Sequence, residues 1–420
     1  MTLRLLVLSV WAAAALSNQN PSEFRVSLSG GALSYYGVRP ERAQAPTPLL
    51  IAIPSQLERA AALAAFEQWS GPASGRGWAL AVPFGRWSGS ADWADTSARL
   101  LEAAVADACG RLEADPARVY LVASGIAAPV AFYAASRIPH RFAAAAVLGG
   151  DPWEAIETNR LFGANTSLVP ILWAASRPAA EAALRKLEAA GYNAVLRPPE
   201  ETLPETALEW LSHHRSAPYP PKVDCETGNP AFARCYWIQI TRFDPAQRND
   251  ALPVSRVPPS SGASFELGRF GYSRMDPGPG VQVERLPENY RGPLRIGDRI
   301  VAVGGRPVEN GTAFQTLMDQ LSEERPVALM VQRGGQRLRL ETRVVLPRRE
   351  ENFTARIQAQ WFPDTGEVLL ISRGVAELRL ELPAGWLPAR LNWNGEEAGT
   401  ASSAGCWMLA AGAALRPCPL

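Results

Sequence analysis

Apolar and polar residues follow two different rhythms along residues 48–217. Six short apolar runs have the composition of buried strands: PLLIAIP, GWALAVPF, RVYLVAS, FAAAAVLGG, VPILWAAS and YNAVLRP. Stretches with helical periodicity separate them, at residues 59–69, 97–112, 128–136, 179–190 and 205–214. Strands that alternate with helices predict an α/β domain, in which a mostly parallel sheet is covered by helices on both faces. We expect its ligands at the carboxyl ends of the strands.

A second pattern begins after the proline-rich stretch SAPYPPKV. CYWIQITRF alternates bulky and polar residues as a half-buried strand does, and similar runs return after residue 353 in TARIQAQWF, EVLLISR, ELRLELP and ARLNWNG. These runs predict one small antiparallel β domain that is interrupted in sequence, with residues 218–258 as its first part and 353–400 as its second. Residues 401–420 are expected to form a C-terminal tail.

The interruption, residues 262–348, has a pattern of its own. In LRIGDRIVAVGGRPV, Gly297 and Asp298 predict a turn, RIVAV a strand, and the following glycine pair a second turn. The next helix places Phe314, Leu317 and Leu321 on one face. These features resemble a bacterial PDZ domain, and we call residues 262–348 the inserted domain.

PDZ domains bind an extended peptide as an added strand and hold its terminal carboxylate with backbone N–H groups of a glycine-containing loop. The resemblance therefore implies an extended peptide or a protein C-terminus as the partner. Leu267 and Gly268 match the loop, whereas Arg269 replaces the usual hydrophobic residue and favours an anionic terminus. Phe270 and Met318 are expected to line the pocket for the terminal side chain. The alternative is an unused groove in a domain that only braces the β domain.

In the stretch DPARVYLVASGIAAPVAFYAASRIPHRFAAAAVLGG, a strand runs through a corner of small residues into a helix. Together with PLLIAIP and GWALAVPFGR, this stretch makes residues 24–220 similar to the α/β-hydrolase superfamily, most closely to secreted esterases of the polyhydroxybutyrate depolymerase and feruloyl esterase type. In that family the corner presents a serine nucleophile. The resemblance implies a three-layer sandwich, and we call residues 19–217 the hydrolase-like domain.

The catalytic motifs of that family are degenerate in this sequence. G-x-S-x-G falls on residues 123–127, A-S-G-I-A, so that Gly125 stands at the nucleophile position and Ser124 lies one residue early. Pro54 and Ser55 replace the oxyanion segment, and proline has no N–H to donate. We therefore expect no catalytic residue at this corner.

The other two members of a catalytic triad are also missing at their expected places. The loop ASRPAAE, where the acid should lie, has no carboxylate before Glu181, which falls inside the next helix. The loop PEETLPE, where the base should lie, has no histidine. An alternative centre would use Ser124 with Glu200 or Glu201, although a carboxylate is a poor base for an alcohol. Three residues before the second helix are candidates for lining a binding pocket: Asp92, Trp93 and Asp95.

The N-terminal sequence MTLRLLVLSVWAAAALSNQN has one basic residue, then an apolar run, then small and polar residues. This order is typical of a secretory signal peptide, which we predict over residues 1–18. We expect a secreted or periplasmic protein; the alternative is an ordinary buried helix. No later stretch is long and apolar enough to predict a membrane span.

Five cysteines suit an exported protein without making it a disulfide scaffold. Cys225 and Cys235 flank a turn and can pair across a hairpin, while Cys406 and Cys418 can pair near the C-terminus. Cys109 lies in an alanine-rich helix and is expected in the core.

Composition narrows the function further. A chain of 420 residues is long enough for two or three domains. Its 42 Lys and Arg against 41 Asp and Glu give no global field that would attract nucleic acid. Neither Cys nor His has the spacing of a metal site, and no cofactor is expected.

Two hypotheses for the function remain. One is an exported PDZ-containing binding or scaffolding protein with an inactive hydrolase-like domain, and the other is a secreted esterase or serine peptidase of unusual construction.

Overall fold

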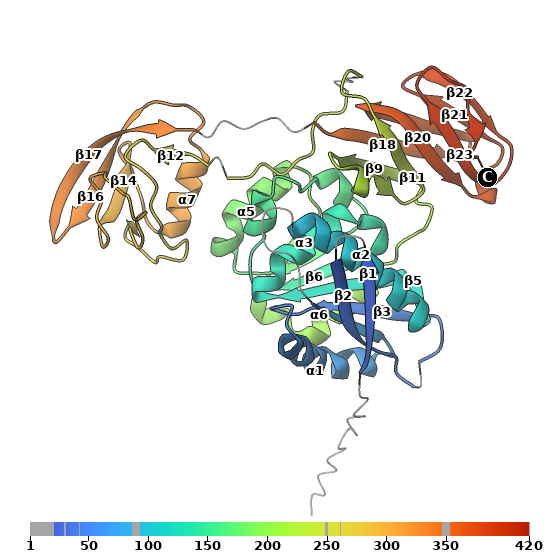
Figure 1. Ribbon diagram of the computed structural model, residues 1–420, viewed down its shortest axis with the longest axis horizontal. Helices are drawn as coiled ribbons and strands as arrows, with labels where there is room; N and C mark the ends of the chain where they lie inside the picture. Colours follow the sequence, from blue (N-terminus) through green and yellow to red (C-terminus); the bar gives the residue numbers. More distant parts are fainter. Residues whose placement is uncertain are drawn as a thin grey trace, which may run out of the picture.

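The computed structural model of the chain describes residues 21–28, 31–41, 43–85, 93–247, 251–260, 262–346 and 353–419. The predicted signal peptide lies outside these residues. Figure 1 shows three units: the hydrolase-like domain in the centre, the inserted domain in orange to its left, and the β domain, mostly red, to its upper right. The three-unit architecture is the one that the residue patterns predict.

The sheet of the hydrolase-like domain has eight strands in the order β1-β2-β4-β3-β5-β6-β7-β8. All six predicted strands are present and run parallel to one another. They are β3 (Thr47–Ile53), β4 (Ala79–Phe84), β5 (Ala114–Ser124), β6 (Ala144–Leu148), β7 (Ile171–Ala174) and β8 (Ala194–Arg197). Two further strands, β1 (Ser22–Leu28) and β2 (Gly31–Val38), form an antiparallel hairpin at one edge. The prediction missed this hairpin.

Helices cover both faces of this sheet, which gives the predicted three layers. One buried cluster joins the sheet to α2 (Trp93–Arg111), α3 (Ala128–Arg137) and α5 (Arg177–Ala189). A second cluster joins the other face to α1 (Arg59–Gly75) and α6 (Pro204–Ser212). Each predicted helix is therefore present, with its ends within six residues of the predicted ones.

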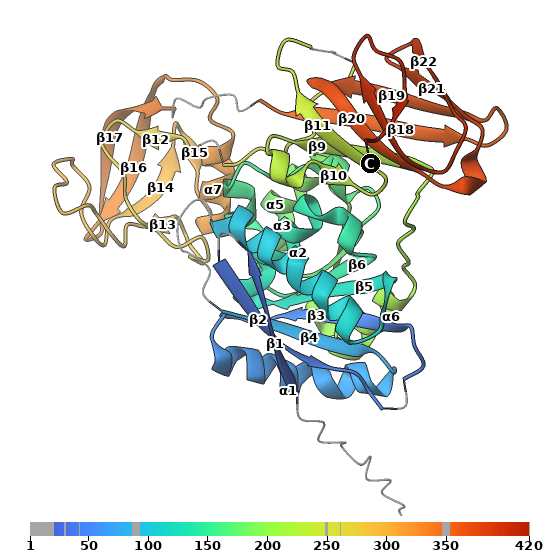
Figure 2. The same ribbon diagram turned by 45° about the vertical axis from the view of Figure 1, so that its right-hand side comes forward.

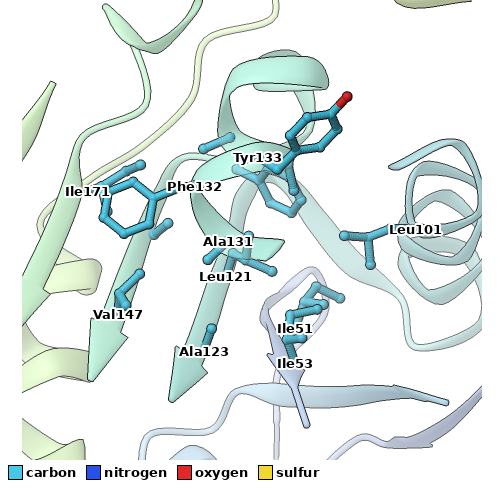
Figure 3. Close-up of a cluster of buried hydrophobic side chains, with 14 of the residues drawn as sticks. Ile51, Ile53, Leu101, Leu121, Ala123, Ala131, Phe132, Tyr133, Val147 and Ile171 are labelled. Carbon is cyan, nitrogen blue, oxygen red and sulfur yellow. The ribbon is translucent and has the colours of Figure 1, made fainter. Parts of the chain in front are cut away.

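Small residues let α3 approach the sheet closely. Figure 3 shows Ala131 above Leu121 and Ala123 of β5, with Phe132 reaching over β6 towards Ile171. Alanines have no side chain beyond Cβ, so the helix backbone lies close to the strands and the interior stays close-packed. The alanine-rich composition of the stretch after the corner therefore has a packing role.

The β domain consists of two five-stranded sheets that enclose one buried cluster. In one sheet, β9 (Lys222–Thr227) pairs with β18 (Ala355–Phe362). In the other, β11 (Ile238–Phe243) pairs with β20 (Val375–Leu382). Strands from before and after the interruption thus share both sheets, which confirms that the two parts form one domain. The pairing is antiparallel except between β19 (Glu367–Arg373) and β21 (Ala389–Trp393), which are parallel.

The predicted boundary at residue 400 is wrong, because the expected tail belongs to the β domain. β22 (Glu396–Ala401) is followed by β23 (Gly405–Ala410) and by the short β24 (Arg416–Pro417). The sheet that contains β23 and β24 has the order β10-β11-β20-β23-β24, in which β10 is Arg234–Cys235. Alternate residues of β23 face the core, where Trp407 and Leu409 are buried. This period of two marks a half-buried strand, and the prediction overlooked it because the run is only six residues long.

Both proposed cysteine pairs form disulfides, Cys225 with Cys235 and Cys406 with Cys418. The first does not cross a hairpin: β9 and β10 belong to different sheets, so this bond joins the two layers of the β domain. The second links β23 to the residue that follows β24. Cys109 packs against the core of the hydrolase-like domain, where burial raises the pKa of its thiol to about 11.

The inserted domain has a small sheet in the order β12-β17-β16-β14-β13 and one helix, α7 (Gly311–Asp319). Figure 2 shows α7 on the side that faces the hydrolase-like domain. Phe314, Leu317 and Leu321 are buried together, as their spacing predicts. The strands are β12 (Ser264–Phe265), β13 (Val281–Gln282), β14 (Arg299–Val303), β16 (Pro326–Arg333) and β17 (Gln336–Val345), with β15 (Arg306–Pro307) paired to β14.

The linker that leads to the inserted domain lies against the hydrolase-like domain. Val257 is fully buried and donates its N–H to the carbonyl of Leu161 at 2.8 Å. Gly163 donates its N–H to the carbonyl of Ser255 at 2.9 Å. These strand-like bonds fix the direction in which the chain leaves for the inserted domain.

One buried carboxylate joins the linker and both parts of the β domain. Glu226, in β9, is 1% exposed. One of its oxygens accepts from the Thr354 hydroxyl at 2.5 Å and from Arg373 at 3.0 Å, and the other accepts from the N–H and the hydroxyl of Ser255 at 2.7 and 2.8 Å. Its own N–H donates to Asn165 of the hydrolase-like domain at 2.7 Å. The side chains of Thr354, Arg373 and Ser255, with the Ser255 N–H, thus all donate to the one carboxylate of Glu226.

We predict that Glu226→Gln lowers the free energy of unfolding by about 3 kcal/mol, because the amide removes the charge partner of Arg373 and turns an NH₂ group towards donors. Urea unfolding followed by tryptophan fluorescence measures the loss. Glu396→Gln, at an exposed position of β22, is the matched control and should change stability by less than about 0.5 kcal/mol. Equal stabilities of the two variants would contradict the role given to Glu226.

Candidate functional site

The corner after β5 keeps the shape of a nucleophile elbow without the nucleophile. Gly125 has φ +56°, in the left-handed region that favours glycine, and opens the short turn before α3. A Cβ placed on Gly125 would meet no atom within 4 Å, so the position faces open space. The carbonyl of Gly125 is packed closely against Gly150, where a Cβ would lie only 1.9 Å from that oxygen.

The neighbouring positions offer no substitute for the missing groups. Ser124 is the last residue of β5, has extended backbone angles (φ −134°, ψ 142°) and is half-buried. Within the described part of the chain its hydroxyl has no hydrogen-bond partner that could activate it. Pro54 is buried after β3 and Ser55 is exposed. Pro54 has no backbone N–H, so it cannot donate a hydrogen bond to an oxyanion.

The acids and bases considered for the corner lie elsewhere in the described part of the chain. Glu181 lies inside α5, where it accepts from Arg185 at 3.1 Å. Glu200 and Glu201 are exposed on a short turn after β8. The loop after β7 carries Ser176 at the N-cap of α5 but no carboxylate.

The three histidines have partners elsewhere in the domain. His140 lies 3.0 Å from Glu102, and its burial lowers its pKa although the carboxylate opposes this shift. His213 lies 3.3 Å from Glu209, and the ring of His214 packs on Trp210. None of these contacts involves the corner after β5.

Asp95 lines a cavity of about 520 Å³, but this cavity lies between the hydrolase-like and β domains. Its carboxylate accepts from Tyr133 at 2.5 Å, from Arg137 and Arg160 at 3.0 Å each, and from Asn229 of the β domain at 2.8 Å. Burial alone would raise the pKa of Asp95, but the charge of Arg137 and the other donors outweigh it and lower the pKa. Asp92 and the side chain of Trp93 lie outside the described residues.

The inserted domain borders the carboxyl ends of β6 and β7. Lys186 of α5 lies 3.9 Å from Asp319 of α7, and the guanidinium of Arg274 stacks on the ring of Trp153, 4.7 Å from its centroid. The edge of the sheet where ligands are expected is therefore partly covered by a second domain.

The five residues proposed for peptide binding lie in the inserted domain, in the loop at 267–270 and on α7. Leu267 and Phe270 are half-buried against its core, Met318 is buried, and Arg269 is exposed. Gly268 has φ +109°, and a Cβ there would lie 2.8 Å from a ring atom of Tyr290. The loop therefore needs glycine at this position, both for its backbone angle and for space.

Part of the expected carboxylate loop is already hydrogen-bonded. Gly268 donates its N–H to Phe265 at 2.9 Å, and Leu267 donates its N–H to the Thr342 hydroxyl at 3.2 Å. Among the described residues, no acceptor is bonded to the N–H groups of Arg269 and of the residue after it. Any terminal carboxylate must use these two groups and the Arg269 side chain.

Helix α7 is held against the segment at Tyr272 and Ser273. The Tyr272 hydroxyl lies 2.5 Å from Gln315 Oε1 of α7, and burial raises the pKa of Tyr272 to about 12. A Cβ on Gly311, at the start of α7, would lie 2.3 Å from the carbonyl oxygen of Ser273. The start of α7 and the segment at Ser273 therefore touch through their backbones, which leaves no room for an added strand between them.

Comparison with known proteins identifies the inserted domain. Residues 274–344 match the family model of the PDZ domain, so the loop at 267–270 lies just before the matched segment. No curated protein is significantly similar to the chain.

Several solved structures resemble parts of the chain at low identity. A thermostable esterase has a TM-score of 0.36 and 15% identity over 47% of this chain and 63% of that one, so this chain spans less than two thirds of its length. An S-formylglutathione hydrolase from Agrobacterium tumefaciens has a TM-score of 0.35 and 12% identity over 47% of this chain and 95% of that one. An acetyl xylan esterase from Aspergillus awamori has a TM-score of 0.25 and 17% identity over 31% and 52%. Similarity at this level says nothing about the activity of this chain.

Two other kinds of site were sought in the described residues. No group of three or more His, Cys, Asp and Glu side chains there could hold a metal ion. No helix in the same residues is both long and apolar enough to cross a membrane.

We predict that the chain is not labelled by a serine-directed fluorophosphonate at the corner after β5, because Gly125 has no hydroxyl and Pro54 has no N–H to stabilise an adduct. Mass spectrometry of the labelled, digested protein tests this. Gly125→Ser should raise ester hydrolysis less than about tenfold, because the three histidines have partners elsewhere and none can serve as its base. Labelling at Ser124, or strong turnover by Gly125→Ser, would refute the prediction.

We also predict that Asp95→Asn lowers stability at neutral pH by about 3 kcal/mol, because Arg137, only 2% exposed, loses its charge partner. The pKa of Asp95 is lower in the folded chain than in the unfolded one. Its ionised form therefore stabilises the fold above pH about 4, and this contribution disappears as the pH falls further.

Urea unfolding at several pH values should accordingly show wild type and Asp95→Asn converging below pH about 4. Asp364→Asn, at an exposed turn of the β domain, should match wild type throughout. A gap between wild type and Asp95→Asn that does not change with pH would show that the carboxylate charge is not the cause.

Proposed function

We propose that this chain is an exported binding or scaffolding protein, in which a PDZ domain takes up protein C-termini and the hydrolase-like domain has no catalytic activity. The observation that carries the proposal is the PDZ match over residues 274–344 together with the exposed Arg269 at the open end of its groove. A cation at this place suits a terminal carboxylate, because charge-assisted hydrogen bonds are shorter and stronger than neutral ones.

The geometry of the groove limits what can bind. Tyr272 and Gln315 close it on one side, and the backbone contact at Gly311 closes it beyond them. An added strand therefore has room only near Gly268, where the aromatic ring of Phe270 can pack against an apolar terminal side chain. We infer that the domain recognises the last residues of a partner and little of the sequence before them.

The absence of catalysis rests on the corner after β5. Gly125 occupies the nucleophile position and none of the three histidines contacts that corner. Losing nucleophile, base, acid and oxyanion donor together removes both the covalent step and its electrostatic support. The alternative, an esterase built around Ser124, has no described partner for the hydroxyl that would activate it.

Export has independent support in the two disulfides. Bonds such as Cys225–Cys235 persist in oxidising compartments and are rare where thiols are kept reduced. Together with the predicted signal peptide at residues 1–18, they favour a secreted or periplasmic location.

Titration of the full chain with a random library of C-terminal peptides tests the proposal. We expect a subset ending in an apolar residue to bind in the micromolar range, or about 8 kcal/mol. Amidation of the same peptides should weaken binding at least about tenfold, because the charge that Arg269 recognises is lost. Arg269→Glu should have the same effect.

Arg337→Glu, at an exposed position of β17, is the matched control and should leave peptide binding unchanged. If no peptide binds, or if Arg269→Glu and amidation have no effect, the inserted domain does not recognise C-termini and only braces the β domain. Ester hydrolysis by the purified chain would instead support the enzyme hypothesis.

A further inference from the structure

A cavity of about 330 Å³ lies between the hydrolase-like domain and the inserted domain. One side is formed by residues 149–151 after β6 and by 174–176 after β7, and the other side by Arg274, Met275 and the first turns of α7. Its volume lies at the lower end of the ~300–1,000 Å³ typical of small-molecule sites. Its position, at the carboxyl ends of parallel strands, is where open α/β sheets bind ligands.

The walls of this interdomain cavity are mainly apolar and well fixed. Trp173 is 1% exposed, donates its indole N–H to Gly150 at 3.1 Å and packs edge-on against Phe132. Trp153 is 8% exposed and forms a second aromatic wall. Between them the lining consists of small side chains, which leave the space open: Ala174, Ala175, Ala179, Ala180 and Ala182.

Arg274 is the cation of this cavity. Its guanidinium lies over the ring of Trp153, and its side chain also contacts the Tyr272 hydroxyl. Within the described residues no carboxylate lies within ion-pair distance of it. A guanidinium that stacks on an aromatic face keeps its N–H edge available, and this edge fits the two oxygens of a carboxylate.

Asp151 is the one carboxylate in the lining. It is exposed, and one of its oxygens accepts the N–H of Trp153 at 2.9 Å, so it is held at the first turn of the next helix. The other polar groups of the lining belong to Ser176, Thr312 and Gln315, which are uncharged. The cavity therefore combines one cation available for pairing with a body of apolar walls.

We propose that this cavity binds a small organic acid with an apolar body, its carboxylate paired with Arg274 and its body packed between Trp153 and Trp173. The two tryptophans belong to the hydrolase-like domain and the arginine to the inserted domain. The ligand consequently contacts both domains at once and stabilises their contact. This site is distinct from the peptide groove near Gly268.

Ligand-observed NMR titration of the full chain with hexanoate tests the proposal, with hexanamide and hexylamine as neutral and cationic probes of the same body. Hexanoate should bind saturably, hexanamide at least tenfold more weakly, and hexylamine not measurably. Arg274→Gln should weaken hexanoate binding at least tenfold. Arg291→Gln, at an exposed position of the same domain, should change it less than twofold.

Two further variants separate the possible results. Asp151→Asn should bind hexanoate as tightly as wild type or more tightly, because it removes a like charge. Arg269→Glu should leave hexanoate binding unchanged, so that failure of the peptide proposal does not affect this one. A thermal unfolding midpoint for Arg274→Gln within a few degrees of wild type ensures that the loss of binding is local.

Three results would overturn the proposal. They are the absence of saturable hexanoate binding, equal affinity for hexanoate and hexanamide, and full binding by Arg274→Gln. Preferential binding of hexylamine that is lost in Asp151→Asn would reassign the cavity to cations.

Discussion

The buried carboxylate of Glu226 is the interaction on which the arrangement of the domains depends. An ionised group away from water is costly unless donors surround it, and here Ser255, Thr354 and Arg373 supply them from three separate segments. Ser255 belongs to the linker, Thr354 to the return of the chain after the inserted domain, and Arg373 to β19. The same residue binds Asn165 of the hydrolase-like domain through its backbone. The segments that lead into and out of the inserted domain, at Ser255 and Thr354, are thus both hydrogen-bonded to the carboxylate of Glu226.

The shape of the corner after β5 depends on two glycines. Gly125 keeps positive φ, and Gly150 keeps the close contact with its carbonyl, yet no side chain projects from the corner. A strained turn persists only where the surrounding structure determines it. Here α3 packs closely on β5 and β6 through alanines, and this packing holds the corner in place.

Sequence patterns predicted the helices and strands better than the domain boundaries and the contacts between elements. Runs such as RVYLVAS indicate a buried strand because they are short, mainly apolar and rich in β-branched and aromatic residues. The β1–β2 hairpin and β23 were missed since short alternating runs carry little signal until a partner strand is known. At the candidate site, the sequence alone was enough for Gly125 and Pro54, because glycine has no hydroxyl and proline has no backbone N–H. The closure of the groove by Tyr272 and Gln315 depends on a long-range contact that no local pattern encodes.

The inserted domain covers the edge of the sheet at the loop after β7, where the resemblance to hydrolases placed a catalytic acid. Here this loop has Ala175 and Ser176, and Arg274 with Met275 from the inserted domain lies across it. A carboxylate at this loop would have to share the space with the stacked pair of Arg274 and Trp153. Small residues instead leave a cavity there. The linker to the inserted domain is held at Ser255 by its hydrogen bonds to Glu226, which limits how closely the inserted domain can approach. The interdomain cavity therefore exists because this loop has small side chains while Arg274 and Met275 close the space from the other domain.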